Sequence, residues 1–216
     1  GFAARLAPLI ADFAARGPRA LLARWRAAPV PAAFVAERRE AAAFDRSFPA
    51  EGVHGLARHR SRIAALTPGE DVLRLGQGWP GAGLPHHRLP DWHLDKLARL
   101  HGRVRVLGAQ ENTLCRSYIT ERPFDAFAVG AMPAVIAGPG HRLHDLVDAA
   151  AMIDTHGCPP DLAAARIIAF RPDAAAAEAW CDTAARLAAL LRDSAALAAE
   201  RRRTVAARLH EIGDLL

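Results

Sequence analysis

The sequence contains little cysteine, few aromatic residues and no long apolar run among its 216 residues. No stretch reaches the roughly 18 to 20 uncharged, apolar residues that a membrane-spanning helix needs. The three cysteines, Cys115, Cys158 and Cys181, lack C-x-x-C spacing and predict neither a disulfide framework nor a zinc site. Aromatic residues at 6% are too sparse for a surface that binds single-stranded nucleic acid by stacking. The start of the chain has no signal-peptide pattern, so the sequence predicts a cytoplasmic protein in a reducing compartment.

Lysine is almost absent too, and arginine carries the positive charge. Lys96 is the single lysine among 28 basic residues, a bias that, with the many alanines, is typical of a GC-rich bacterial genome. The net charge of +5 and the pI of about 10.0 favour an anionic partner without choosing between nucleotide, lipid headgroup and nucleic acid. The 51% of hydrophobic residues is typical of a globular protein. Because the chain lacks an initiator methionine, we interpret it as one part of a longer protein.

Strand and helix patterns alternate along the middle of the chain. We expect strands at 32–36, 71–75, 103–109, 133–137 and 151–154, and helices at about 56–66, 91–100, 120–129 and 142–149. This alternation predicts an α/β fold with a parallel, Rossmann-like sheet. We expect three parts: a helical segment over 1–28 broken at Gly17-Pro18, a Rossmann-like domain over 29–172, and C-terminal helices over 173–216 that pack back on the domain.

Polar side chains gather directly after the predicted strand 103–109. In an open parallel sheet, ligands bind beyond the carboxyl ends of the strands, which here means the loops 76–90, 110–122 and 138–142. Glu111 and Asn112 suit the hydroxyl groups of a sugar or ribose, and Tyr118 can stack on a base. A helix N-terminus with Arg122 suits a diphosphate. The alternative is a helix capped by Thr120 and a solvated Glu111.

A family resemblance lies in the run ENTLCRSYITERPFDAFAVGAMPAVIAGPGH. It resembles the signature of the α1,3-fucosyltransferase family (glycosyltransferase family 10), which has E-N-S, Y-[VI]-T-E-K, an alanine-containing helix, G-x-x-P-[IV] and a G-x-P loop. The matching residues are Glu111, Asn112, Tyr118, Thr120, Glu121, Gly130, Pro133, Gly138 and Pro139. The chain departs from the signature at Thr113, where the family has serine, and at Arg122, where the family lysine helps hold the donor pyrophosphate. Arginine can serve a phosphate bidentately.

The resemblance covers about residues 30–170 and implies a GT-B fold, of which this chain holds the C-terminal, donor-binding domain. It implies inverting transfer of fucose from GDP-fucose to a glycan acceptor, with no metal and no other cofactor. A phosphate-binding arginine of the family lies on an upstream helix, where Arg60 matches best and Arg58 and Arg62 compete with it. The donor-binding residues implied by the resemblance are Arg60, Glu111, Asn112, Tyr118, Glu121 and Arg122.

The resemblance does not supply a catalytic base. In the family that carboxylate comes from the N-terminal, acceptor-binding domain, of which the segment 1–28 is a remnant or an edge. The carboxylates upstream of Arg60 that we considered look like surface groups, and we assign no catalytic residue; they are Asp12, Glu37, Glu40 and Asp45.

Several other features favour ordinary structural roles. The histidines His86, His87 and His93 lack metal-site spacing, and we expect no metal. The segment Gly76-Gln77-Gly78 does not match the dinucleotide fingerprint, so we expect a plain loop. For Trp79 and Trp92 we favour packing over contact with an acceptor.

Three alternatives to the fucosyltransferase remain open at this point. The chain can be a transferase for another nucleotide-activated sugar, or a nucleotide-sugar-binding module without turnover. Nucleic-acid binding is supported by charge alone, and we expect no such partner.

The run Arg201–Arg203 allows peripheral contact with the inner membrane through a C-terminal basic helix, while a solvated helix face is the alternative.

Overall fold

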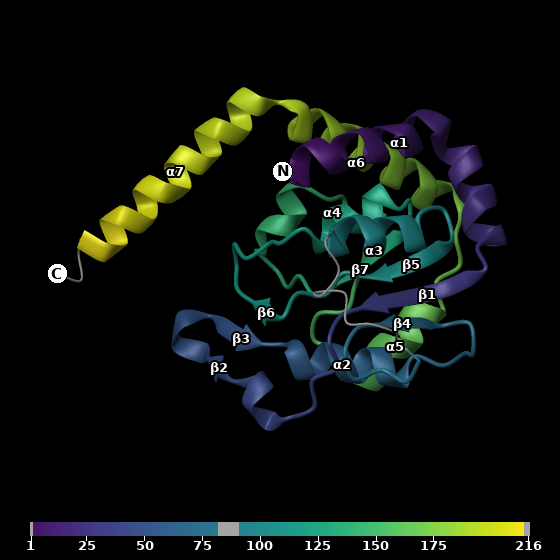
Figure 1. Cartoon of the computed structure of the whole chain (residues 1–216), viewed down its shortest axis with the longest axis horizontal. Coiled ribbons are helices and arrows are strands. Elements are labelled where there is room, and N and C mark those ends of the chain that lie inside the picture. Colours follow the sequence, from purple (N-terminus) through teal and green to yellow (C-terminus); the bar gives the residue numbers. More distant parts are fainter. Residues whose placement is uncertain (1, 82–90, 214–216) are drawn as a thin grey trace.

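A five-stranded parallel sheet forms the centre of the molecule (Figure 1). The computed structural model describes residues 2–81 and 91–213, with the side chains at 204 and from 207 onward left out. Every neighbouring pair in this sheet is parallel. From edge to edge the strands are β4 (Leu73–Leu75), β1 (Val30–Val35), β5 (Val104–Gly108), β7 (Met132–Val135) and β8 (Ile153–Asp154). The predicted α/β fold with a parallel sheet is therefore confirmed.

Helices cover both faces of this sheet. One layer contains α1 (Phe2–Ala27), α3 (Trp92–Leu100), α4 (Arg122–Ala128) and α6 (Ala174–Arg192), and the other contains α2 (Ala57–Leu66) and α5 (Pro160–Ile168) (Figure 1). Because both faces are covered, β1 and β7 are apolar throughout, and Ala32 to Val35 of β1 are all buried.

Two tryptophans join α1 and α6 to the sheet layer. Trp25 and Trp180 are fully buried, and their ring centroids lie 6.1 Å apart. The indole N–H groups donate to the carbonyl oxygens of Gly130 and Ala131, at 2.9 Å and 3.0 Å. Gly17 has non-helical angles (φ 78°, ψ 169°), so the break that the sequence predicts inside the first helix is confirmed.

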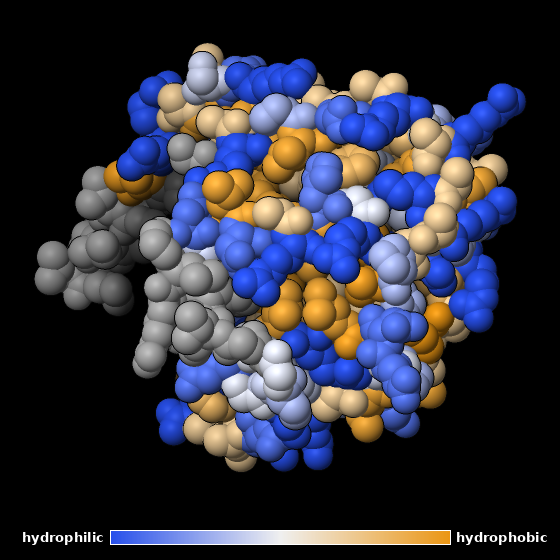
Figure 2. Space-filling view, turned by 45° about the vertical axis from the view of Figure 1, so that its right-hand side comes forward, coloured by the Kyte–Doolittle hydropathy of each residue, from blue (hydrophilic) through white to orange (hydrophobic). Residues whose placement is uncertain are grey.

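One continuous hydrophobic core includes residues from α1 through α6. Leu6, Ile10 and Phe13 of α1 belong to this core, so the first helix packs as a layer of the domain. The division of the chain at residues 28 and 172, and the relation of 1–28 to an acceptor domain, stay predictions. The described surface mixes apolar patches with hydrophilic residues on the face shown in Figure 2.

The last two helices differ in how they pack. α6 lies against α1, as expected for the C-terminal segment, whereas α7 (Ser194–Gly213) extends away from the body of the molecule (Figure 1). The described side chains of α7 are mostly exposed, and the basic run Arg201–Arg203 is fully so. The expectation that the C-terminal helices pack back on the domain describes α6, whereas α7 extends away from it. Among the described residues, no helix is long and apolar enough to cross a membrane.

Some predicted elements are wrong, and some were not predicted. The helix expected at 142–149 is two short 3-10 turns, η4 (Arg142–Asp145) and η5 (Ala149–Ala151). The chain between β1 and α2, expected as irregular, holds η1 (Ala42–Asp45), η2 (Pro49–Glu51) and two strands of a small antiparallel sheet. Its strands are β2 (Ser47–Phe48), β3 (Val53–Gly55) and β6 (Thr113–Leu114). Elements of two to four residues are too short to show a hydrophobic period.

Candidate functional site

The order of the strands reverses between β1 and β5. From β1 the chain crosses to β4 on one side and then returns to β5 on the other side. In an open α/β sheet, the crevice beyond the carboxyl ends of two such strands is the usual ligand site. A pocket lies there, with walls from β1, α2, β5 and α4 that include Arg60, Gln110 and Arg122. Its volume is about 10 Å³, which is room for roughly one water or one ligand oxygen.

Two glycines let the chain pass closely around this pocket. At Gly108, a Cβ atom would collide with the Phe34 ring and come within 3.0 Å of Gln110 Oε1. Gly76 has a φ of 128°, and a Cβ atom there would lie 2.5 Å from the carbonyl oxygen of Ala36. The segment after β4, expected as a plain loop, therefore packs directly against the end of β1.

Arg60 is buried in the pocket without a carboxylate partner. Arg60 is only 7% exposed, and its Nη1 donates to the carbonyl oxygen of Gln110 at 3.5 Å. Its Nε atom has no hydrogen-bond partner among the residues that the structure describes. Burial lowers the pKa of Arg60 to about 9, and the charges of Arg122 and Arg39 lower it further, while Glu111 opposes them. Arg60 thus stays cationic at neutral pH in a place where an anion would relieve its burial.

The two arginines that compete with Arg60 in the sequence lie elsewhere. Arg58 pairs with Asp45, at 3.2 Å, and Arg62 is exposed to solvent. Arg60 is therefore the arginine of α2 that lines the pocket.

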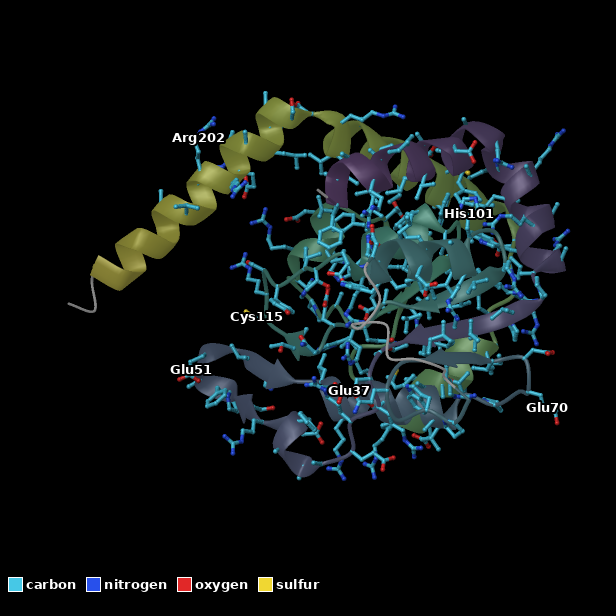
Figure 3. All side chains as sticks on the ribbon, in the orientation of Figure 1. Glu37, Glu51, Glu70, His101, Cys115 and Arg202 are labelled. Carbon is cyan, nitrogen blue, oxygen red and sulfur yellow. The ribbon has the colours of Figure 1, made fainter. Side chains whose placement is uncertain are left out.

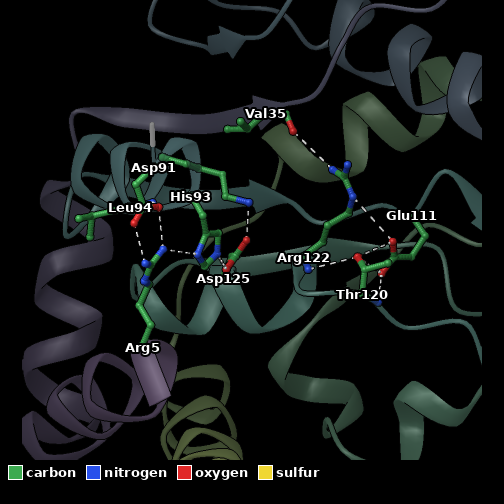
Figure 4. A network of polar contacts seen from close by, with 10 residues as sticks. Arg5, Val35, Asp91, His93, Leu94, Glu111, Thr120, Arg122 and Asp125 are labelled. Atoms are coloured by element: carbon green, nitrogen blue, oxygen red, sulfur yellow. Dashed lines mark hydrogen bonds and ion pairs between the residues drawn. The ribbon is translucent and has the colours of Figure 1, made fainter. Parts of the chain in front are cut away.

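Glu111 is buried and tightly held, not solvated (Figure 4). Its carboxylate accepts hydrogen bonds from Thr120 N, at 2.7 Å, and from Thr120 Oγ1, at 2.9 Å and 2.8 Å to its two oxygens. Burial raises the pKa of Glu111, and the Thr120 hydrogen bonds and the Arg122 charge oppose that shift. Arg122 Nε lies 3.7 Å from Glu111 Oε2. Glu111 thereby holds the loop before α4 and orients Arg122 toward the pocket.

The expected helix cap at Thr120 is wrong. α4 begins at Arg122, two residues later than expected, and its N-cap residue Glu121 makes no capping bond. Thr120 Oγ1 is engaged with Glu111, and the backbone N–H of Arg122 reaches it only at 3.5 Å. α4 has seven residues and Pro123 in its first turn, so its N-terminus offers few free N–H groups. The positive charge at this end comes mainly from the Arg122 side chain.

The remaining residues implied by the resemblance line the edge of the same loop. The backbone carbonyl oxygen of Asn112 accepts a hydrogen bond from Leu56 N, at 2.8 Å. Its side-chain Oδ1 is buried and has no partner within residues 2–81 and 91–213. Tyr118 is 38% exposed and lines a second small pocket with Glu111 and His141. Glu121 is half-buried and raises the pKa of Glu111 slightly.

A larger hollow adjoins that second pocket through His141. Its volume is about 440 Å³, within the range of small-molecule sites. Its lining has no carboxylate and comprises Gly52, His54, Leu114, Arg116, Gly138, Pro139, Gly140, His141 and His156. The hollow lies at the carboxyl ends of β7 and β8, so it continues the site along the sheet edge. A sugar or a nucleobase fits a space of this size.

His93, considered in the sequence as a metal ligand, belongs to a buried ion network (Figure 4). Its Nε2 lies 2.8 Å from Asp125 Oδ1, and Lys96 forms an ion pair with the other oxygen of Asp125. Arg5 lies 3.3 Å from His93 Nδ1 and pairs with Asp91 through both oxygens, at 2.8 Å and 2.6 Å. This network ties α1, α3 and α4 together.

The two tryptophans considered in the sequence, Trp79 and Trp92, both pack within the domain. Trp79 is packed as expected, donates to the carbonyl oxygen of Ala36 and also forms a wall of the pocket. Trp92 stacks edgewise on His93. His86 and His87 lie outside the described residues. In the part of the chain that the structure describes, no three His, Cys, Asp or Glu side chains are arranged to hold a metal ion.

The carboxylates considered as catalytic bases are each paired with an arginine. None of these carboxylates is among the residues that line the switch-point pocket. The pairs are Asp12 with Arg16 at 2.7 Å, Glu37 with Arg39 at 2.9 Å, Glu40 with Arg38 at 2.6 Å, and Asp45 with Arg58 at 3.2 Å.

Fold and pocket together define a parallel α/β domain with a cationic pocket at the switch point of its sheet, which suits a phosphorylated ligand. Comparisons with protein-family models, with curated proteins and with solved structures found no match. The choice among phosphorylated ligands therefore depends on the residues of the site. Sequence reasoning missed Gln110, which lines the pocket, because a single glutamine before Glu111 carries no distinguishing pattern.

Proposed function

We propose that this chain is the donor-binding, C-terminal part of a GT-B glycosyltransferase. In this proposal it binds GDP-fucose, and the complete enzyme transfers fucose to a glycan hydroxyl with inversion and without a metal. The observation that supports the proposal best is Arg60, a buried cation with no carboxylate partner, which faces Arg122 across a pocket at the switch point. Such a site is incomplete without an anion, because burial of an unpaired charge is costly.

In this proposal one phosphoryl oxygen of the donor enters the pocket between Arg60 and Arg122, and the rest of the diphosphate lies at its mouth. Two guanidinium groups suit a diphosphate, since each can give paired N–H donors to non-bridging oxygens. Glu111 keeps Arg122 in place, so its role is to position the arginine. The free Oδ1 of Asn112 accepts from a hydroxyl or N–H of the nucleoside, and the larger hollow beyond Tyr118 has room for the base or the sugar.

A specific observation favours a second candidate, a nucleotide-sugar-binding module without turnover. The carboxylates that precede Arg60 and were considered as bases are all paired with arginine, and the pocket lining contains no carboxylate. General-base catalysis needs a basic group within hydrogen-bond reach of the acceptor hydroxyl, and in the family that the chain resembles this group is a carboxylate. The glycosyltransferase proposal therefore requires that a further domain supplies the base and binds the glycan.

Titration calorimetry with GDP, guanosine and GDP-fucose tests the proposal on the chain as it is. We expect GDP and GDP-fucose to bind and guanosine to bind far more weakly, because only the first two bring phosphates to the arginines. Equal affinity for GDP and guanosine would contradict the proposed placement of the diphosphate. Binding to DNA with a steep dependence on salt, and none to GDP, would favour a nucleic-acid partner instead.

A further inference from the structure

Gln110 is a buried polar residue whose side chain is only partly satisfied. It follows β5 directly, is 3% exposed and lines the switch-point pocket beside Arg60. Its Nε2 atom is buried and has no hydrogen-bond partner among the described residues. A buried donor without a partner destabilises the fold, so its presence at a pocket calls for an acceptor, which a bound water or a ligand oxygen supplies.

The backbone fixes Gln110 in this position. Gly108 has no side chain, and this leaves room for the carboxamide of Gln110. A Cβ atom at position 108 would lie only 3.0 Å from Gln110 Oε1. The carbonyl oxygen of Gln110 accepts the contact from Arg60 Nη1, at 3.5 Å. The backbone of Gln110 therefore contacts the Arg60 guanidinium. Gln110 and Arg60 both line the pocket of about 10 Å³.

The polar side chains of this largely apolar pocket are mostly hydrogen-bond donors. Among the described residues, Gln110 Nε2 and Arg60 Nε have no partners and no carboxylate lines the pocket. The space admits roughly one oxygen-sized atom. Unsatisfied donors beside a cation match an anionic oxygen, and they disfavour a cation or a neutral donor.

We propose that Gln110 is a specificity-determining residue that, together with Arg60, receives one phosphoryl oxygen of the ligand. This proposal rests on the proposed function in taking a phosphorylated ligand, and it adds the residue that selects an oxyanion over other groups. Inorganic phosphate, GDP and GDP-fucose share the phosphoryl oxygen, so all three are probes of the pocket.

Two substitutions separate this role from a structural one. Gln110→Met keeps the length of the side chain and removes the donor, and Gln110→Glu places a negative charge where the phosphoryl oxygen would enter. Gln77→Glu is the matched control, because Gln77 is exposed and the same charge change there leaves the pocket intact. Each variant is titrated with inorganic phosphate, GDP and GDP-fucose by calorimetry, and its Tm is measured with and without phosphate.

We expect Gln110→Met to weaken the binding of all three probes by about 10- to 100-fold. Its Tm without ligand should equal or exceed that of the wild type, because the unsatisfied donor is gone, while the rise in Tm on adding phosphate is lost. Gln110→Glu should bind weaker still, and Gln77→Glu should bind as the wild type does. A residue that only supports the fold would lower the Tm without ligand instead.

Wild-type affinity for the probes in folded Gln110→Met would overturn the proposal, whether or not Gln110→Glu folds. If GDP still binds in an Arg60-dependent way, the proposed function survives that result. A third result is that Gln110→Met weakens the binding of inorganic phosphate while GDP binds the wild type no better than phosphate does. In that case the role of Gln110 in the pocket holds and the proposed nucleotide-sugar function fails. If the wild type binds neither phosphate nor GDP, both proposals are wrong.

Discussion

Arg60 and Arg122 line one pocket from two different helices, and after burial the charge of Arg122 is the largest cause that lowers the pKa of Arg60 to about 9. Two like charges are held together here although nothing within the described residues neutralises Arg60. Arg122 has Glu111 at 3.7 Å, but the hydrogen bonds from Thr120 already occupy that carboxylate. An anion between the two guanidinium groups would remove the repulsion and the cost of burial together.

Arg122 is the residue at which the chain departs from the fucosyltransferase signature, so its role is testable by exchange. Arg122→Ala should cost about 1.5 to 3 kcal/mol of GDP binding, which is roughly a 10- to 150-fold loss of affinity. Arg122→Lys should restore most of that loss, since an ammonium group also binds phosphate. Calorimetry with GDP measures both, and unchanged affinity in Arg122→Ala would exclude Arg122 from the phosphate site.

The burial of Arg60 should reduce the stability of the ligand-free chain. In the folded chain its pKa is lowered to about 9, so above that pH the unfolded chain binds more protons than the folded one. The contribution of Arg60 to the free energy of unfolding therefore rises as the pH increases above about 9. The free energy of unfolding of the Arg60→Met variant should equal or exceed that of the wild type at neutral pH. Any difference in favour of the variant should become smaller as the pH rises toward about 10.5.

Urea unfolding of both proteins at neutral and alkaline pH measures this difference. A wild type that is clearly more stable than Arg60→Met at neutral pH would show that Arg60 has an adequate partner in the folded chain.

Donor binding should not depend on a metal ion. The pocket is lined by arginine and carboxamide groups, whereas Mg²⁺ sites use carboxylates to hold the ion against the phosphates. GDP affinity should therefore be the same before and after treatment with EDTA. A large loss of affinity in EDTA, restored by Mg²⁺, would show that a metal bridges the protein and the diphosphate.

The chain by itself should bind donor without efficient transfer. The carboxylates considered as bases pair with arginines outside the pocket lining, so none of these four is placed to deprotonate an acceptor hydroxyl. Transfer assays with GDP-fucose and a panel of glycans should give no more product than a chain with Arg60→Ala. Robust turnover by the wild type would direct attention back to Glu37, Glu40 and Asp45.

The basic run of α7 provides a separate test of membrane contact. Arg201–Arg203 are exposed on a helix that extends from the domain, and Arg202 projects away from the body of the molecule in Figure 3. If α7 binds anionic lipid, vesicles with anionic headgroups should pull down the chain at low salt, and neutral vesicles should not. Equal binding of a variant with Arg201, Arg202 and Arg203 changed to Gln would show that this run has no part in it.

Long, periodic elements could be predicted from the sequence, and short or tertiary ones could not. The strand at 103–109 and the helix at 56–66 match β5 and α2 within two residues, because their apolar residues follow the period of one structure. The small antiparallel sheet has no such signal. α5 was not predicted although Pro160 begins it and Ala163, Ala164 and Ile167 form its buried side. Thr120 fits a helix-capping pattern in the local sequence. In the folded chain its hydroxyl instead donates to the buried carboxylate of Glu111, a tertiary contact that the local sequence does not indicate.

The same limit applies to the site. The resemblance singled out Arg60 with Arg58 and Arg62 as rivals, since all three lie on one basic helix. Burial separates them, because α2 packs on the sheet along the side that carries Arg60. The sequence could not identify Gln110 as a pocket residue, because its place depends on the strand order that puts the end of β5 beside β1.

The most direct test of the central claim compares Arg60→Ala with Arg62→Ala, two equal changes on the same helix. Calorimetry with GDP and with guanosine gives the phosphate contribution for each variant as the difference between the two ligands. We predict that Arg60→Ala lowers GDP affinity by about 10- to 150-fold and leaves guanosine binding unchanged, while Arg62→Ala alters neither. Equal GDP affinity in the two variants would contradict the assignment of the switch-point pocket as the diphosphate site.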